Sequence, residues 1–246
     1  MAQPAAATRP RRGLKRGTLT PEMIVTESLR LLDVYGVAGF SLPKLGRALG
    51  ADQTAVYRHF ASKDDLLLAI ADRLVEESTS NLTAHDCWVE TLVEVAREMR
   101  LTYLAHPAAA MLSACRTTRR PAEMHAVDVI IGAVLDAGFT GAVAARIYRG
   151  FGDFVLAWAG SEAAFFSLTD NQQSYDRAAW TQAYLGVKRS DYPNIWRLRT
   201  ALPEIADDEV FETALALMMD GLIAQAPQPC ACARHSLKRP GRTRAP

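Results

Sequence analysis

The sequence predicts an all-α fold with an N-terminal three-helix helix-turn-helix domain followed by a larger C-terminal helical domain. Apolar residues recur at helical spacing along most of the 246-residue chain. Two short helical patterns near the N-terminus are separated by a glycine-containing turn. No segment shows the strict apolar–polar alternation of a strand. With 49% apolar residues, the chain can bury a sizeable core.

The first two helices are bounded by capping residues. Thr20 can cap a helix whose first turn holds a proline and a glutamate, and Gly36 ends its apolar pattern. Ser41 can cap a second, shorter helix that ends at Gly50 in the turn. About three residues then separate it from a third helix, a layout typical of a helix-turn-helix.

The third helix is expected to begin after Asp52 and to run through Phe60. Val56 and Phe60 lie four residues apart, so both face the core of the small domain. The opposite face can meet DNA base edges and the flanks can reach phosphates. An ordinary amphipathic helix with a solvated polar face is the alternative. Ser62-Lys63-Asp64-Asp65 resembles a capping box that opens a long fourth helix.

The segment from Ile24 to Leu74 resembles the DNA-binding domain of the TetR (tetracycline-repressor) family of bacterial transcription regulators. The resemblance is carried by Gly36, Ser41, Leu45, Leu49, Gly50, the run Val56-Tyr57-Arg58-His59-Phe60 and Ser62-Lys63. Glu27 and Ser28 replace the usual alanines, and Gly46 interrupts the second helix at an expected cost of about 1 kcal/mol. The resemblance implies a double-stranded DNA operator as partner. The candidate DNA-binding residues are Ser41, Lys44, Gln53, Thr54, Tyr57, Arg58, His59 and Lys63.

The remainder of the chain also reads as helices. They are expected at about 88–103, 107–117, 121–136, 142–166, 177–185 and 207–225. Within them, YPNIWRLRTALPEI and VFETALALMMDGLIA resemble the C-terminal pattern of the tetracycline branch of the same family.

The helices at 142–166 and 207–225 each carry apolar residues on nearly two faces. One face of each can pack on its own chain and the other against a two-fold mate, which predicts a homodimer held by four helices. The family resemblance implies the same arrangement. A large core within one chain is the alternative.

Charge and length suggest four segments. Residues 1–20 and 227–246 each hold five Lys or Arg and no acid, so a net charge of +1 leaves about −9 between them. We expect a disordered basic arm at 1–17, a helix-turn-helix domain at 18–65, an effector-binding and dimerisation domain at 66–226, and a disordered basic tail at 227–246. The ends can bind a polyanion or merely aid solubility.

The expected compartment is the cytoplasm. No apolar run approaches the roughly 20 residues that span a bilayer, and no secretory signal is evident. The four cysteines show no disulfide framework: Cys87 and Cys115 stand alone in helical patterns.

Catalysis is not expected. His85-Asp86-Cys87 and Cys230-Ala-Cys232 lack the paired spacing of a zinc site, and no phosphate loop or nucleophile motif is present. We therefore expect no enzyme activity, no metal and no cofactor.

The expected function is sequence-specific transcriptional regulation by a repressor that a small apolar or aromatic ligand releases from a palindromic operator. A DNA-binding protein whose C-terminal domain docks a protein partner, and an enzyme with an appended DNA-binding domain, are the alternatives. Aromatic and thioether side chains that can converge above the DNA-binding domain are candidates for the ligand pocket. They are Trp88, Met99, Tyr103, Met111, Phe151, Phe154 and Trp158, with His106 and His125 as polar handles. No ionised group among them indicates a charged ligand.

Overall fold

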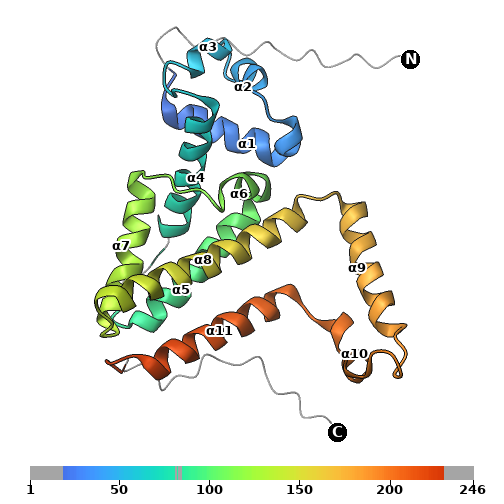
Figure 1. The fold of residues 1–246 in the computed structure, drawn as a ribbon. Helices are drawn as coiled ribbons and strands as arrows, with labels where there is room; N and C mark the ends of the chain where they lie inside the picture. The colour runs from blue at the N-terminus through green and yellow to red at the C-terminus, as the bar shows by residue number, and fades with distance from the viewer. Residues whose placement is uncertain (1–18, 81, 83–84, 230–246) are drawn as a thin grey trace, which may run out of the picture.

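The computed structural model describes residues 19–80, 82 and 85–229, and every regular element in this part of the chain is helical. The helices are α1 (Pro21–Gly39), α2 (Leu42–Ala48), α3 (Gln53–Val56), α4 (Lys63–Ser80), α5 (Trp88–Ala105), α6 (Pro107–Ser113), α7 (Pro121–Asp136), α8 (Gly141–Phe166), α9 (Asp170–Leu185), α10 (Pro193–Leu198), the 3-10 turn η1 (Leu202–Glu204) and α11 (Asp207–Gln225). The all-α prediction is confirmed. Figure 1 shows α1 to α3 grouped at one end, with α4 leading from them into the larger group of helices.

The small domain forms where its caps predict. The side chains of Thr20, Ser41 and Asp52 accept backbone N–H groups of the helices that follow them. Val56 and Phe60 are 1% and 3% exposed, as the helical wheel predicts. These two side chains join the buried cluster that includes residues of α1 and α2, so the short helices are held by a shared core.

In the small domain, two helix ends differ from the sequence prediction. The assigned α1 runs to Gly39, but Gly36 has a φ of 64° and a kink lies there, so the regular helix ends near the predicted glycine. Helix α3 ends at Val56 instead of Phe60. Beyond it the N–H of His59 bonds the carbonyl of Val56, three residues back, so the last turn is tighter than an α-helix.

The start of α4 is capped in a modified way. The Ser62 hydroxyl accepts the N–H of Asp65 at 3.0 Å, which is half of a capping box. The Asp65 carboxylate accepts the N–H of Ala61 at 2.9 Å, one residue earlier than a capping box requires. The predicted start is therefore confirmed, with Asp65 fixing the entry into the helix.

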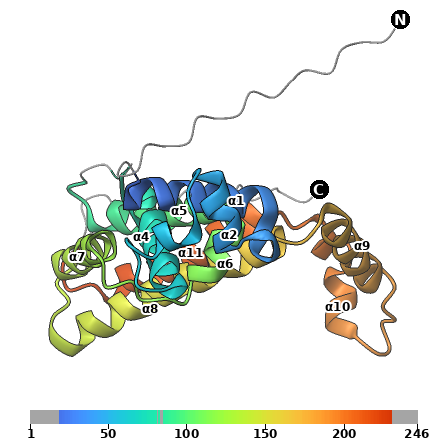
Figure 2. The same cartoon turned by 90° about the horizontal axis from the view of Figure 1, so that it is seen from above.

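In the larger domain α5, α6 and α7 pack against α4, α8 packs against α5, α6 and α7, and α11 lies along α5. Helices α9 and α10 stand apart from this body in both views (Figures 1 and 2). Helix α9 starts seven residues before the predicted 177–185 segment, because Thr169 and Gln172 form a full capping box. No helix was predicted between residues 185 and 207, so α10 and η1 were missed.

Several expectations fall on residues at the edge of the structure. The basic arm at 1–17 and residues 230–246 of the basic tail lie outside the described residues. Cys115 is a free, exposed thiol, as expected. Cys87 is disulfide-bonded, so the expectation that it stands alone is wrong.

Gly46 is explained by packing and not by helix propensity. A Cβ atom at this position would lie 2.9 Å from the carbonyl oxygen of Ala51 and 3.0 Å from the backbone nitrogen of Gln53. The turn between α2 and α3 therefore approaches α2 as closely as backbone allows. The glycine that interrupts the predicted helix is what lets the two helices meet.

We predict that Gly46→Ala lowers the free energy of unfolding by about 1–3 kcal/mol, because backbone atoms must shift to admit the methyl group. Helix propensity alone predicts the opposite sign. Gly132→Ala in α7, where a Cβ meets nothing within 4 Å, is the matched control and should raise that free energy by up to about 1 kcal/mol. Urea denaturation of both variants measures the difference, and an equal gain in both would contradict the packing argument.

Candidate DNA-binding surface and internal cavity

The polar residues of α3 and its C-terminal turn face solvent. Gln53, Thr54, Arg58 and His59 are exposed, and the Tyr57 ring is 48% exposed although the neighbouring Val56 is buried. Lys63, at the start of α4, is exposed as well. The structure therefore brings the predicted base-facing and phosphate-facing side chains together at one end of the molecule.

Three of the eight candidates, Thr54 among them, have partners within the protein. The Ser41 hydroxyl caps α2, and the Thr54 hydroxyl donates to the Asp52 carboxylate. Lys44 Nζ lies 3.2 Å from the centroid of the Tyr35 ring and 3.3 Å from the carbonyl oxygen of Gly39. Hydrogen bonds from Thr54 to Asp52 lower the pKa of that carboxyl group and so favour the charged, capping form.

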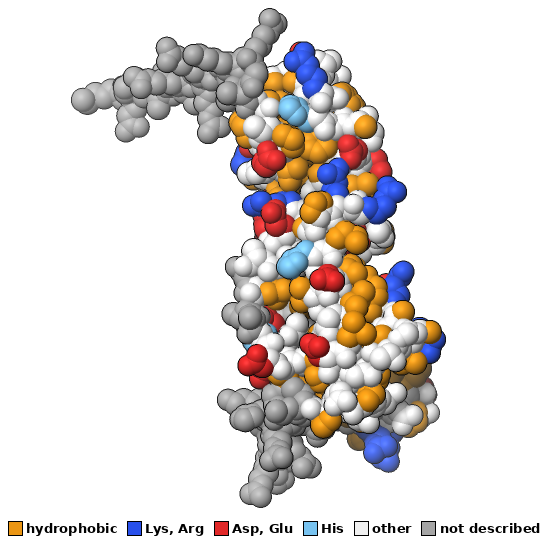
Figure 3. All heavy atoms as spheres, turned by 90° about the vertical axis from the view of Figure 1, so that its left-hand side faces the viewer, with side chains coloured by type: hydrophobic (Ala, Val, Ile, Leu, Met, Phe, Trp, Pro, Cys, Tyr) orange, Lys and Arg blue, Asp and Glu red, His pale blue; other side chains and the backbone are white. Residues whose placement is uncertain are grey.

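Charged side chains of both signs are exposed at this end of the described chain, with Asp52 and Asp64 as well as Arg58 and Lys63. Figure 3 shows basic and acidic side chains interspersed on one side of the molecule, including the half that holds the DNA-binding helices. Positioning on a phosphate backbone would therefore rely on a few placed cations such as Lys63.

An apolar cavity of about 100 Å³ lies inside the larger domain. Its walls come from α4, α5, α7, α8 and the end of α6. Tyr103 is 2% exposed, and burial raises the pKa of its hydroxyl to about 12, against a smaller opposing effect of a hydrogen bond with Ser113. The hydroxyl is therefore protonated at neutral pH and can act as a donor in a mainly apolar space.

A second hollow of about 520 Å³ adjoins this cavity on its outer side. Five residues line both spaces: Arg116, Glu123, Tyr148, Gly152 and Leu156. Burial and the nearby charge of Glu123 raise the pKa of Tyr148. The two hollows together form a site with an apolar interior and a polar mouth, a pattern typical of small-molecule sites.

The predicted pocket residues are divided among three places. Met99, Tyr103 and Phe151 line the inner cavity, and Met111 lines the outer hollow. Phe154 and Trp158 line a separate hollow beside α11, where the Trp158 ring meets Phe211. Trp88 lines none of the three hollows.

The helical phase explains the error for these aromatic residues. Phe151 and Val155, four residues apart on α8, turn toward the inner cavity, which turns Phe154 and Trp158 away from it. Trp88 is buried two turns of α5 before the nearest cavity residue, Val95. The prediction that all seven side chains share one pocket is therefore wrong.

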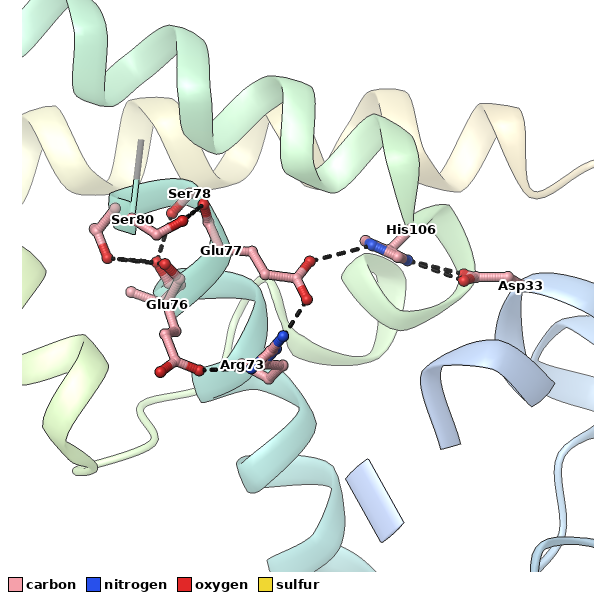
Figure 4. Close-up of polar contacts among 9 residues, drawn as sticks. Asp33, Arg73, Glu76, Glu77, Ser78, Ser80 and His106 are labelled. Carbon is pink, nitrogen blue, oxygen red and sulfur yellow. Dashed lines mark hydrogen bonds and ion pairs between the residues drawn. The ribbon is translucent and has the colours of Figure 1, made fainter. Parts of the chain in front are cut away.

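Neither histidine lines the cavity. His125 is exposed on α7, and His106 lies at the junction of α5 and α6. Figure 4 shows His106 between carboxylates of two other elements: its Nδ1 lies 3.0 Å from Asp33 of α1 and its Nε2 lies 3.3 Å from Glu77 of α4. His106 thus joins the small domain to the body of the protein instead of contacting a ligand.

The polar groups of the site were missed in the sequence. Thr118, Glu123 and Tyr148 all line it. Glu123 was visible as an acid in the first turn of the helix that starts at Pro121, a position that also serves helix capping, so nothing in the pattern marked a cavity. The named candidates include no ionised group, but Arg116 and Glu123, which were not among them, line the cavity.

Helix α4 is bonded to the wall of this site through three aspartates. The Asp72 carboxylate accepts the Thr118 hydroxyl at 3.0 Å and the Glu123 N–H at 2.9 Å, and so caps α7 from a different helix. Arg116 bonds both oxygens of Asp64 at 2.9 Å, and Arg120 bonds Asp65 at 2.6 Å. The loop between α6 and α7 is therefore tied to the helix that leaves the small domain.

The outer faces of α8 and α11 retain apolar side chains. Phe211, Leu215 and Met219 of α11 are buried at four-residue spacing, whereas Leu217 is 67% exposed. Arg100 of α5 holds the two helices together: its guanidinium bonds Glu162 of α8 at 2.6 Å and Asp208 of α11 at 2.7 Å.

Within the described part of the chain, no group of three or more His, Cys, Asp or Glu side chains is placed to hold a metal ion. In the same part, no helix combines the length and the apolar character needed to cross a membrane.

Comparison with known proteins matches both halves of the chain. Residues 24–70 match the profile of bacterial regulatory proteins of the tetR family, and residues 82–226 match the tetracyclin repressor-like C-terminal domain. The class A tetracycline repressor protein from transposon 1721 of Escherichia coli is 29% identical over 206 residues, which cover 83% of this chain and 90% of that protein.

Two further comparisons are more limited. An HTH-type transcriptional repressor of Mycobacterium tuberculosis is 36% identical over 110 residues, but this match covers 44% of this chain and only 42% of the repressor. The crystal structure of the Streptomyces coelicolor TetR family protein ActR in complex with actinorhodin superposes with a TM-score of 0.75 at 23% identity, over 86% of this chain and 99% of that one. At that identity the likeness shows the fold.

We predict that Asp72→Ala lowers the free energy of unfolding by about 1–2 kcal/mol, because α7 loses its cap and the Thr118 hydroxyl loses an acceptor. Glu76→Ala removes an exposed carboxylate of the same helix, 3.1 Å from Arg73, and should cost under about 0.5 kcal/mol. Urea denaturation compares the two variants. Losses of equal size would show that the Asp72 contacts contribute no more than a surface ion pair.

Proposed function

Because this chain belongs to the TetR family of transcriptional regulators, we propose that it is a dimeric repressor released from a palindromic operator by a small ligand with an apolar or aromatic body. The continuity of α4 between the two domains carries the proposal. Its N-terminal end presents Lys63 beside the exposed residues of α3, and Asp72, farther along, bonds the cavity wall. One rigid element thus touches both candidate sites.

The DNA-binding part of the proposal rests on exposed side chains held by a buried core. Arg58 lies on the face that can meet base edges, while Lys63 lies at the start of α4 where it can meet a phosphate. Tyr57 and His59 flank Arg58 and are proposed to contact the backbone of DNA. Ser41, Lys44 and Thr54 remain candidate DNA contacts, although each already has a partner within the protein.

The regulatory part rests on the contacts between α4 and the α6–α7 loop. A ligand shifts a conformational equilibrium only if it binds one arrangement better than the other. Filling the cavity at Thr118 and Glu123 would change the bonds that these residues make with Asp72, and so the position of α4. Met99, Tyr103, Phe151 and Met111 stay proposed ligand contacts.

A homodimer is proposed from the apolar surface that one chain leaves uncovered. Leu217 of α11 is exposed. Phe154 and Trp158 of α8 border an open hollow beside the start of α11. A surface of this kind, rimmed by charged groups such as Glu162 and Asp207, is typical of an association site. A two-fold mate placing its own α8 and α11 there would bury both copies of the surface.

The projecting arm formed by α9, α10 and η1 supports the same assembly. No residue of these three elements is buried, and Tyr175, Trp180 and Tyr192 are each at least 50% exposed. The arm stands beyond the body in Figures 1 and 2. We propose that it lies against the second subunit.

We predict that Arg58→Ala weakens binding to the specific site by about 1–3 kcal/mol and leaves random DNA almost unaffected. Lys63→Ala should weaken both and reduce the slope of log affinity against log salt by about one unit. Sequencing the genomic fragments that the full chain retains supplies the specific site, and fluorescence anisotropy across a salt series measures the affinities. An equal loss for Arg58→Ala on both DNAs would remove its base-reading role, and retention of random fragments alone would contradict sequence-specific regulation.

We also predict that Leu217→Glu converts the dimer into monomers, because a charge would be buried without a partner in the proposed interface. Met124→Glu, on a residue of α7 that is 60% exposed, should leave the dimer intact. Sedimentation equilibrium distinguishes the states. A wild-type monomer, or a Leu217→Glu dimer of unchanged affinity, would place the interface elsewhere or exclude it.

A further inference from the structure

The charges around the cavity are unevenly balanced. Of the cations that line it, Arg116 is paired with Asp64 and Arg149 with Asp153 at 2.7 Å. Glu123 and Asp72, by contrast, have only neutral hydrogen-bond donors as partners among the described residues. Two carboxylates without a cation thus stand in or directly behind one wall of the site.

Glu123 is the carboxylate that a ligand can reach. It lines both the inner cavity and the outer hollow. The Thr118 hydroxyl lies 2.9 Å from its Oε2 atom and donates its single proton either to this oxygen or to Asp72. Oε2 also accepts the backbone N–H of Arg119, and among the described residues Oε1 has no hydrogen-bond donor. Asp72 is turned the other way, toward the α7 backbone. A donor entering from the polar mouth therefore meets Glu123 first.

The surroundings of Glu123 fit a cation attached to an apolar body. Phe151, Val155 and Ile130 line the inner space, which suits an aromatic or aliphatic group. The Tyr148 ring also lies on the shared wall, where an aromatic face can attract a cation. Salt screens ion pairs in partly buried sites less than pairs in open water. The Glu123 carboxylate therefore favours a cationic ligand over a neutral or anionic one.

We propose that the effector is an amphiphilic amine whose protonated nitrogen is received by Glu123 while its apolar part fills the inner cavity. This inference rests on the proposed function, because it names the chemical class of ligand that the same cavity takes. It also gives the ligand a direct route to α4. The group that would bind the amine already holds Thr118, and Thr118 bonds Asp72.

The loop beside Glu123 adds to this route. Arg119 has a φ of 59°, a backbone conformation that residues other than glycine seldom adopt, and its N–H bonds Glu123. A cation that draws the Glu123 carboxylate toward the cavity would loosen two bonds that hold this conformation. The ligand charge is thereby linked to the segment that carries Arg116 and Arg120 against α4.

Three probes with one apolar body test the proposal: naphthylmethylamine, naphthylmethanol and naphthoate, substituted at the same ring position. Calorimetric titration of the full-length protein should show the amine binding about tenfold more tightly than the alcohol, with naphthoate the weakest. Glu123→Gln keeps the size of the side chain and its acceptor for Thr118, and should reduce the preference for amine over alcohol to about twofold or less. Asp128→Asn, an exposed carboxylate of the same helix that lines no cavity, should leave the preference unchanged.

The location of binding is checked with Gly152→Leu, which fills the passage where the two hollows meet and should weaken all three probes. If naphthoate binds the wild-type protein as tightly as the amine does, this measurement alone overturns the proposal. So does an amine preference that persists in Glu123→Gln, or amine binding unaffected by Gly152→Leu. If none of the probes binds, the inference fails, whereas the proposed DNA-binding function is decided separately by the retained genomic fragments.

Discussion

Helix α4 is the element on which the arrangement of this protein depends, because it belongs to two cores at once. Leu66, Ile70 and Leu74 are all at most 1% exposed, on a face that continues from the small domain into the larger one. Burial of such side chains contributes about 1.5–3 kcal/mol each. Removing α4 from either core would therefore cost this free energy of burial. Its polar flank is free to make replaceable bonds with the α6–α7 loop. Because its apolar face stays buried while the hydrogen bonds of its polar flank can be exchanged, α4 can transmit a change from one site to the other.

The sequence could predict those parts of the fold that depend on local signals. The caps at Thr20, Ser41 and Asp52 and the glycine at Gly50 fixed the small domain because each acts on its own helix terminus. The start and end of α11 were also predicted to the residue. No side chain caps this helix, and its start is marked by the acidic residues of its first turn. The extent of α3 was not, since the spacing of its apolar residues does not reveal the three-residue hydrogen bond between His59 and Val56. Gly46 was misjudged because its role depends on how closely a neighbouring turn approaches, which helix propensity does not describe.

The candidate cavity was less predictable, because its residues come from five helices and a loop. Phe151 faces the cavity and Phe154 faces α11, although both are phenylalanines on the same helix. Residue type alone therefore could not show which of them lines the cavity. The correct choice requires the rotation of α8 relative to two neighbours. Glu123 and Thr118 were hidden for a different reason: both also complete the start of α7, so their pattern resembles ordinary capping. His106 was misplaced because a histidine between helices gives no indication of which carboxylates will surround it.

The free energies of the hydrogen bonds between α4 and the cavity wall are small enough for a bound ligand to offset them. Coupling between an effector and DNA is typically about 1–3 kcal/mol, which changes affinity by about 5- to 150-fold. A few hydrogen bonds such as those of Asp72, at about 1 kcal/mol net each, lie in that range, whereas the packing of Leu66, Ile70 and Leu74 exceeds it.

Asp72 lies nine residues after Lys63, about 13 Å along the helix at 1.5 Å per residue. In the proposed dimer, half-sites on one face of DNA are about 34–36 Å apart, so a small tilt of α4 in each subunit would spoil the fit of both. A ligand therefore needs to exchange only the polar bonds of α4, while its apolar face stays packed and serves as the pivot.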